Sequence, residues 1–132
     1  MTTTAPVSER PRAPDAKFRQ AAFVYLHTAI LYEIAAYHMM GTGLLPTRFG
    51  PPALWLAFGA AIGAFVVYGL LRWRTPWFPR VIWIVHSGRL PALVKGAFFA
   101  GDEARLGPAF YLTAIVVVLI TLWMLARAGW DL

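Results

Sequence analysis

The sequence contains no cysteine among its 132 residues. A disulfide framework, a thiolate metal site and a catalytic thiol are therefore excluded. Charged residues are also scarce: they make up 14% of the chain, whereas an ordinary soluble domain has roughly 25%. Hydrophobic residues account for 59%, and the mean hydropathy is +0.59. These values are typical of an integral membrane protein.

Motifs for hydrolytic chemistry are absent as well. The sequence has no HExxH motif and no arrangement of paired carboxylates, so we expect neither a metal site nor catalytic residues, and a non-enzymatic role is favoured. Lys and Arg number 12 against 6 Asp and Glu, which gives a net charge of +6. These basic residues lie at the ends of apolar runs and not on one soluble face. They therefore indicate a lipid bilayer, and not nucleic acid, as the partner.

Long apolar runs predict an all-α fold of four transmembrane helices arranged as two hairpins. A helix needs about 20 residues to cross the hydrocarbon core, and each run approaches that length. The third run is the least apolar, and we expect it to bend or break near residues 88–91, because Pro91 removes a backbone donor and Gly88 relaxes the helix. The predicted spans cover residues 18–40, 53–72, 78–100 and 107–127.

The distribution of basic residues predicts the orientation of these spans. Residues 1–16 should form a disordered cytoplasmic tail, and residues 17–132 the membrane domain. The two outer connections contain only Arg48 and Arg105. Both termini are therefore expected in the cytoplasm of a multi-pass protein of a bacterial-type inner membrane, because eight basic residues lie on the other side. Those eight are Arg10, Arg12, Lys17, Arg19, Arg72, Arg74, Arg80 and Arg127.

The two hairpins share a short sequence similarity. Residues 48–58 read RFGPPALWLAF and residues 105–114 read RLGPAFYLTA. One interpretation is a tandem repeat of a two-helix unit, which would be related by an axis along the membrane normal. The other is that a turn glycine followed by proline is simply a good helix start.

Three charged residues fall inside the predicted spans. A charge at mid-bilayer costs at least ~2.5–3.5 kcal/mol, so such residues usually find a partner. Counted from the cytoplasmic ends of two parallel spans, Glu33 lies between Arg89 and Lys95 in depth. We predict an ion pair of Glu33 with Arg89, or otherwise with Lys95. The pair either fixes one helix to another or forms part of a substrate, proton or ion site.

Two histidines take similar places in the first and third spans. His27 and His86 both lie in the predicted cytoplasmic halves. The favoured interpretation is a hydrogen bond to a neighbouring helix. The alternative is a cofactor, because two imidazoles at one depth can ligate a haem iron, or each can hold a chlorophyll-type pigment.

Small residues predict close helix packing in the first two spans. They form an alanine seam along one side of the first span and a GxxxG pattern in the second, both of which let helix backbones approach closely. The residues are Ala22, Ala29, Ala36, Gly59 and Gly63.

Three functions remain open at this point. The favoured one is a non-catalytic accessory subunit of a larger membrane complex, held by other membrane subunits or by self-association. The second is a small homo-oligomeric transporter or channel that uses Glu33, Arg89 and Lys95. The third is an electron-transfer protein that binds haem or a pigment through His27 and His86.

Overall fold

The computed structural model describes residues 15–41, 52–99 and 107–132, and within these ranges it is helical apart from short turns. No strand occurs in the described residues. The helices are α1 (Asp15–Gly41), α2 (Pro52–Arg72), α3 (Trp77–Ser87), α4 (Leu90–Val94), the single π-helical turn η1 (Lys95–Phe99) and α5 (Pro108–Trp130).

These elements fit the four predicted helical segments closely. α1 and α2 begin and end within a few residues of the predicted spans, and α5 continues to Trp130, three residues beyond the expected end. Two of the helices, over residues 53–72 and 108–130, are long and apolar enough to cross a membrane. α1 is long enough, but its charges and histidines lower its hydropathy. Residues 1–14 of the predicted tail, as well as Arg48 and Arg105 of the outer connections, lie outside the described residues, whereas Asp15 and Ala16, also assigned to the tail, already belong to α1.

The third segment is interrupted where the sequence predicts. α3 ends at Ser87, and Gly88 and Arg89 form a turn before α4 begins at Leu90. Pro91 lies in the first turn of α4. It has no N–H to donate to the carbonyl four residues earlier, and its ring would clash with that carbonyl in a continuous helix. The proline therefore ends α3 and starts a new helix.

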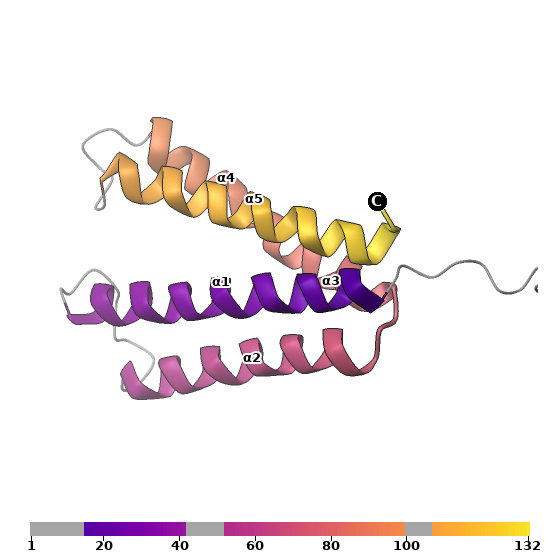
Figure 1. Ribbon diagram of the computed structural model, residues 1–132. Coiled ribbons are helices and arrows are strands. Elements are labelled where there is room, and N and C mark those ends of the chain that lie inside the picture. Colours follow the sequence, from indigo (N-terminus) through magenta and orange to yellow (C-terminus); the bar gives the residue numbers. More distant parts are fainter. Residues whose placement is uncertain (1–14, 42–51, 100–106) are drawn as a thin grey trace, which may run out of the picture.

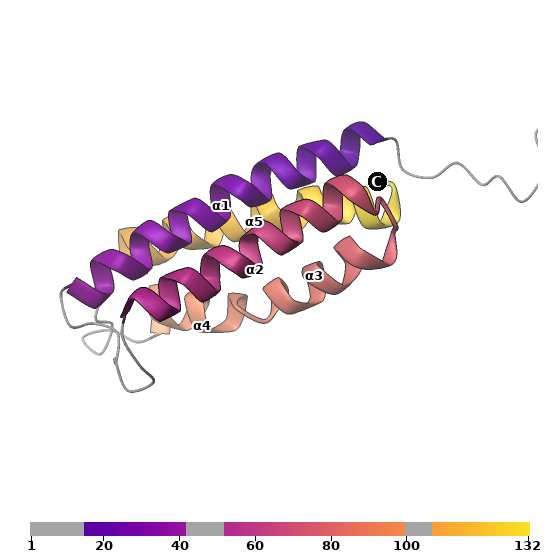
Figure 2. The ribbon, with the colours of Figure 1, turned by 90° about the horizontal axis from the view of Figure 1, so that it is seen from below.

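The helices form two pairs that separate toward one end of the molecule. α1 and α2 lie side by side over their whole length, while α5 packs against both α1 and α3 (Figure 1). α4 and η1 pack chiefly against α5. Figure 1 shows α5 and α4 diverging from the α1–α2 pair, and Figure 2 shows α1 and α2 together on the near side.

The buried side chains gather at the other end, which we call the core end. Phe18, Leu70 and Leu125 are almost completely buried there. The opposite end, formed by residues 29–39, 53–62, 87–99 and 107–117, contains no buried residue in the described part of the chain; we call it the open end. The remaining core residues are Ala21, Ala22, Tyr25, Val66, Phe78 and Ala128.

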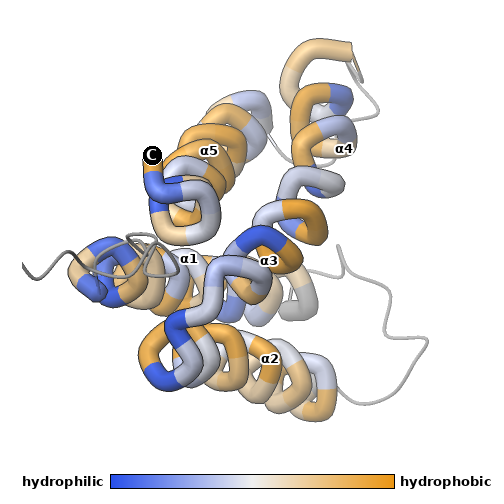
Figure 3. Tube along the Cα trace, turned by 90° about the vertical axis from the view of Figure 1, so that its right-hand side faces the viewer, coloured by the Kyte–Doolittle hydropathy of each residue, from blue (hydrophilic) through white to orange (hydrophobic). Residues whose placement is uncertain are grey.

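Polar contacts fasten the helix ends at the core end. Lys17 Nζ lies 2.7 Å from Asp131 Oδ1 and donates to the carbonyl of Leu132 at 2.9 Å, which joins the start of α1 to the end of α5. Arg80 Nε donates to the carbonyl of Gly129 at 2.8 Å. Figure 3 shows hydrophilic segments of α1 and α2 at this end, beside the C-terminus. The two described termini therefore lie together.

α1 and α2 approach most closely through small residues. A methyl group added at Gly63 would lie 3.1 Å from the Cβ of Ala29, and one added at Gly59 would overlap the carboxylate of Glu33. Ala22 is buried in the core, and Ala36 is half-buried. The GxxxG pattern thus faces α1 within the same chain.

Candidate functional site

A polar pocket of about 190 Å³ lies between α1, α2 and the interrupted third segment. We call it the Glu33 pocket. The pocket lies at the level where the α1–α2 pair and the α3–α5 pair begin to separate. Its walls are Tyr25, Thr28, Ala29, Tyr32, Glu33 and Ala36 from α1, Gly59, Ile62 and Gly63 from α2, His86 from α3 and Arg89 from the turn that follows.

The spacing of residues in α1 brings its polar side chains to this pocket. Tyr25, Thr28, Tyr32 and Glu33 follow one another at intervals of three, four and one positions. At 3.6 residues per turn this places all four along one face of the helix. The glycines of α2 leave room on the opposite wall, because they add no side chain that would fill it.

Two hydrogen bonds separate the pocket from the core. Tyr25 Oη and His86 Nε2 lie 2.8 Å apart, and the two rings meet edge to face at 5.1 Å between centroids. The hydroxyls of Thr28 and Thr121 also lie 2.8 Å apart, and each lies within hydrogen-bond distance of the carbonyl four residues earlier in its own helix. All four of these side chains are buried. The pocket is therefore closed on the core side by polar contacts that join α1 to α3 and to α5.

The helix interruption brings Arg89 to the pocket. Its guanidinium carbon lies 4.5 Å from the centre of the Tyr32 ring. A cation over an aromatic face at this distance is attracted by the ring quadrupole. Glu33 enters from α1, and its carboxylate covers the backbone of α2 at Gly59. One acid and one base therefore line the same small cavity.

The structure brings Glu33 and Arg89 to one pocket without joining them in an ion pair. Among the described residues, the ion pairs within 4 Å are Lys17–Asp131 and Arg74–Asp15, both at the core end. Arg89 packs instead on Tyr32. Lys95, the other partner predicted for Glu33, is exposed in η1 and does not line the pocket.

The two histidines do not meet. His27 is exposed on α1, where its Nδ1 lies 2.8 Å from the carbonyl of Phe23 and its ring packs on the Phe23 ring at 4.4 Å. His86 is buried and bonded to Tyr25. Tyr25 and His27 are two positions apart, about 200° around the helix, so the His27 ring points away from His86. This arrangement does not form one bis-histidine site.

Four polar residues of the pocket and of the contacts that close it on the core side were not singled out from the sequence: Tyr25, Thr28, Tyr32 and Thr121. Tyrosine and threonine are compatible with apolar runs, so they do not interrupt the hydropathy signal that predicts spans. The spacing of Tyr25, Thr28 and Tyr32 on one helical face was the available signal. Within the described ranges, no three His, Asp or Glu side chains are grouped as they would be around a metal ion.

Comparisons with models of protein families, with curated proteins and with solved structures found no match to this chain.

Proposed function

We propose that the protein is a multi-pass membrane protein that binds a small zwitterionic solute in the Glu33 pocket and carries it across the bilayer. Support for membrane placement comes from the two long apolar helices and from large apolar side chains that are exposed along every long helix, such as Phe23, Phe58 and Trp123. In water these exposed apolar side chains would favour aggregation, whereas in a bilayer they contact lipid acyl chains.

The observation that carries the proposal is the pair of opposite charges that share one pocket without pairing. In a low-dielectric surrounding, each charge needs a partner. A solute with one cationic and one anionic group satisfies both at once, its cation beside Glu33 and its anion beside Arg89. The volume of about 190 Å³ suits a small solute, of the size of an amino acid or a betaine.

The uneven closure of the pocket supports transport rather than storage. On the core side the pocket is shut by the Tyr25–His86 and Thr28–Thr121 contacts. On the other side the helix pairs diverge. Movement of the α3–α5 pair against the α1–α2 pair would open one side as it closes the other, which is the general scheme of alternating access. With both termini in the cytoplasm, as the basic residues predict, the closed side faces inward.

The test is ligand-dependent stabilisation of the purified protein in lipid nanodiscs. A panel of small zwitterions is compared with monocations and monoanions of similar size. A bound zwitterion at 100 times its Kd should stabilise the protein by about 2.7 kcal/mol, which raises its Tm. Glu33→Gln and Arg89→Gln should each abolish the shift, and Lys95→Gln, a charge outside the pocket, should leave it intact. Equal shifts with monoanions, or an unchanged shift in both pocket variants, would refute the proposal.

A second candidate function, the accessory subunit of a larger membrane complex, is favoured by His27. Its ring is exposed on the side of α1 that faces away from His86, and its one hydrogen bond within the described residues is to the Phe23 carbonyl. A polar ring edge toward lipid is costly, and a neighbouring subunit would supply a partner.

His27→Leu should then release a stoichiometric partner that copurifies from native membranes. Thr113→Val, which removes an exposed hydroxyl bonded within α5, serves as the matched control. Retention of the same partner by His27→Leu would argue against this second function and leave the pocket proposal untouched.

A further inference from the structure

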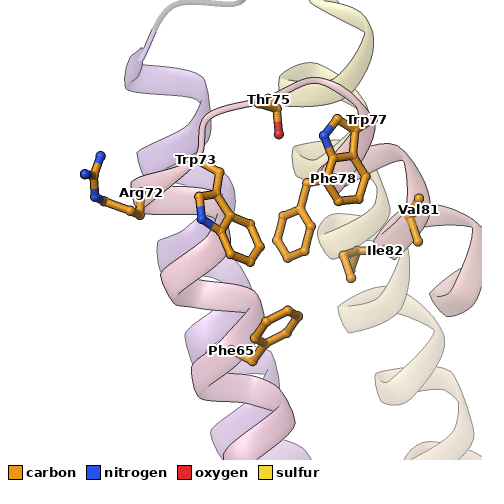
Figure 4. A pocket seen from close by; sticks show the side chains of 8 residues that line it. All are labelled: Phe65, Arg72, Trp73, Thr75, Trp77, Phe78, Val81 and Ile82. Carbon is orange, nitrogen blue, oxygen red and sulfur yellow. The ribbon is translucent and has the colours of Figure 1, made fainter.

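A second pocket lies between α2 and α3 at the core end of the molecule. Its volume is about 700 Å³. We call it the aromatic cup, because four of its eight lining residues are aromatic (Figure 4). The rings belong to Phe65, Trp73, Trp77 and Phe78; Val81 and Ile82 complete the apolar wall, and Arg72 and Thr75 are the polar members.

The rings of the cup hold one another in fixed positions. Phe78 meets Trp73, Trp77 and Phe65 edge to face, with centroid distances of 5.2, 5.7 and 5.9 Å. Edge-to-face pairs at these distances are favourable beyond the area they bury. Gly69 allows the approach, since an added Cβ would lie 2.5 Å from the Phe78 ring. The cup therefore exists before any ligand arrives.

One polar atom in the cup has no partner. The hydroxyl oxygen of Thr75 is buried and makes no hydrogen bond with the described part of the chain. Figure 4 shows this hydroxyl directed from the α2–α3 connection toward the rings. The connection turns through Arg74, whose φ of 49° is left-handed, and this turn precedes Thr75 directly. A buried hydroxyl without an acceptor is unfavourable, so a ligand that supplies one gains affinity.

The charge at the rim of the cup is positive. Arg72 ends α2 at the rim, and in Figure 4 its guanidinium extends outward from the rings. The neighbouring Arg74 is engaged with Asp15 at 2.7 Å. No ion pair within 4 Å involves Arg72 among the residues that the structure describes, and no acid lines the cup. Arg72 is exposed, and rotation about its side-chain bonds would bring its guanidinium from the outward position of Figure 4 to an anionic group at the rim.

We propose that the aromatic cup binds one acyl chain of an anionic phospholipid. The chain lies against Phe65, Phe78 and Ile82, the ester carbonyl at its head accepts a hydrogen bond from Thr75, and the phosphate group lies beside Arg72. Tryptophans at the rim suit this depth, since indoles prefer the level where acyl chains meet headgroups. The inference rests on the membrane placement proposed above and is independent of the Glu33 pocket.

The experiment is native mass spectrometry of the full chain released from vesicles that contain equal amounts of phosphatidylglycerol and phosphatidylcholine. We expect one phospholipid to remain bound, with phosphatidylglycerol preferred by about fivefold, the factor that one basic residue near a membrane surface provides.

Arg72→Gln should remove the preference, whereas Arg19→Gln, an equal loss of charge on another surface of the core end, should keep it. Thr75→Val should lower retention of both lipids by about fivefold, as for one neutral hydrogen bond; Thr113→Val should not. Val81→Trp, which fills the cup from an exposed position, should abolish retention.

Several outcomes would overturn the proposal. Equal retention of the two lipids would show that Arg72 does not select the headgroup. Normal retention by Val81→Trp would show that the lipid does not bind in the cup. A retained free fatty acid, or a second copy of the chain in place of lipid, identifies a different occupant. Extraction of the protein from membranes by alkaline carbonate would refute the membrane placement and the lipid site together. Resistance to carbonate without lipid preference would refute the lipid site alone.

Discussion

The core end and the open end of this small molecule differ in what their side chains do. At the core end, residues from α1, α2, α3 and α5 are buried against one another, and ion pairs fasten the helix termini. At the open end none of the described residues is buried, and α4 and η1 rest chiefly on α5. The polar pocket lies where the two regions meet. Stability is therefore concentrated in one half, and the two charged residues of the pocket, Glu33 and Arg89, lie where close packing stops.

The largest effect should come from removing a core side chain. Leu125 is fully buried, whereas Leu119, less than two turns earlier in the same helix, is 50% exposed. Leu125→Ala should lower the free energy of unfolding by about 2–5 kcal/mol, because it leaves a cavity. Leu119→Ala should cost less than about 1 kcal/mol. Unfolding of the purified variants in mixed micelles measures both, and equal losses would contradict the difference in packing between these two positions of α5.

A smaller effect is expected from the hydrogen bond that closes the pocket. Tyr25→Phe removes the hydroxyl bonded to buried His86, so it should cost about 1–3 kcal/mol, because the imidazole nitrogen loses its partner. Tyr37→Phe removes a hydroxyl from a ring that is 70% exposed at the open end, and it should be nearly neutral. The same unfolding measurement compares them. If Tyr25→Phe is as stable as the parent, the contact does not hold α1 to α3.

The smallest effect on stability is expected at Gly59, where the effect on ligand binding should be large. A methyl group there displaces only the end of the flexible Glu33 side chain, and alanine is the better helix former by about 1 kcal/mol. Gly59→Ala should therefore keep its Tm within a few degrees yet lose the zwitterion-dependent shift. Gly63, one turn along the same face, also lines the pocket, but an added methyl there meets Ala29 and not Glu33, so Gly63→Ala should keep more of that shift than Gly59→Ala. Loss of binding in both variants would mean that helix spacing, and not Glu33, is what the methyl disturbs.

The sequence alone was sufficient to predict the helical segments and the interruption of the third segment. Hydropathy gives the length of a run, and Pro91 gives the place where a helix must end, so both predictions needed no knowledge of packing. Depth matching also identified Glu33 and Arg89, which lie in one pocket. Depth matching did not show whether the two side chains touch, because depth fixes the position of a residue along the helix axis and not its rotation about that axis. The turn at Gly88 and Arg89 directs the guanidinium to Tyr32, and η1 leaves Lys95 outside.

The histidines illustrate the same limit. His27 and His86 occupy similar depths, yet one is exposed and the other is buried against Tyr25. Tyr25 and His27 are two positions apart in α1, and that offset is enough to direct the two side chains to different surfaces. A cofactor held between both histidines would require the rotation of one helix by about half a turn.

The interruption of the third segment has a consequence for how this protein can evolve. α3 is held at the core end by Phe78 and by the Arg80–Gly129 contact. α4 packs on α5 and is linked to α3 by two residues. Substitutions in α4 and η1 can thus alter the tilt of this short arm without passing through the packed core. Under the proposed function, selection for folding acts mainly at the core end and selection for a solute mainly around the Glu33 pocket, and Tyr25 belongs to both regions. If the pocket binds a solute as proposed, a lineage that carries this fold could change its ligand while all core residues except Tyr25 stay outside the pocket.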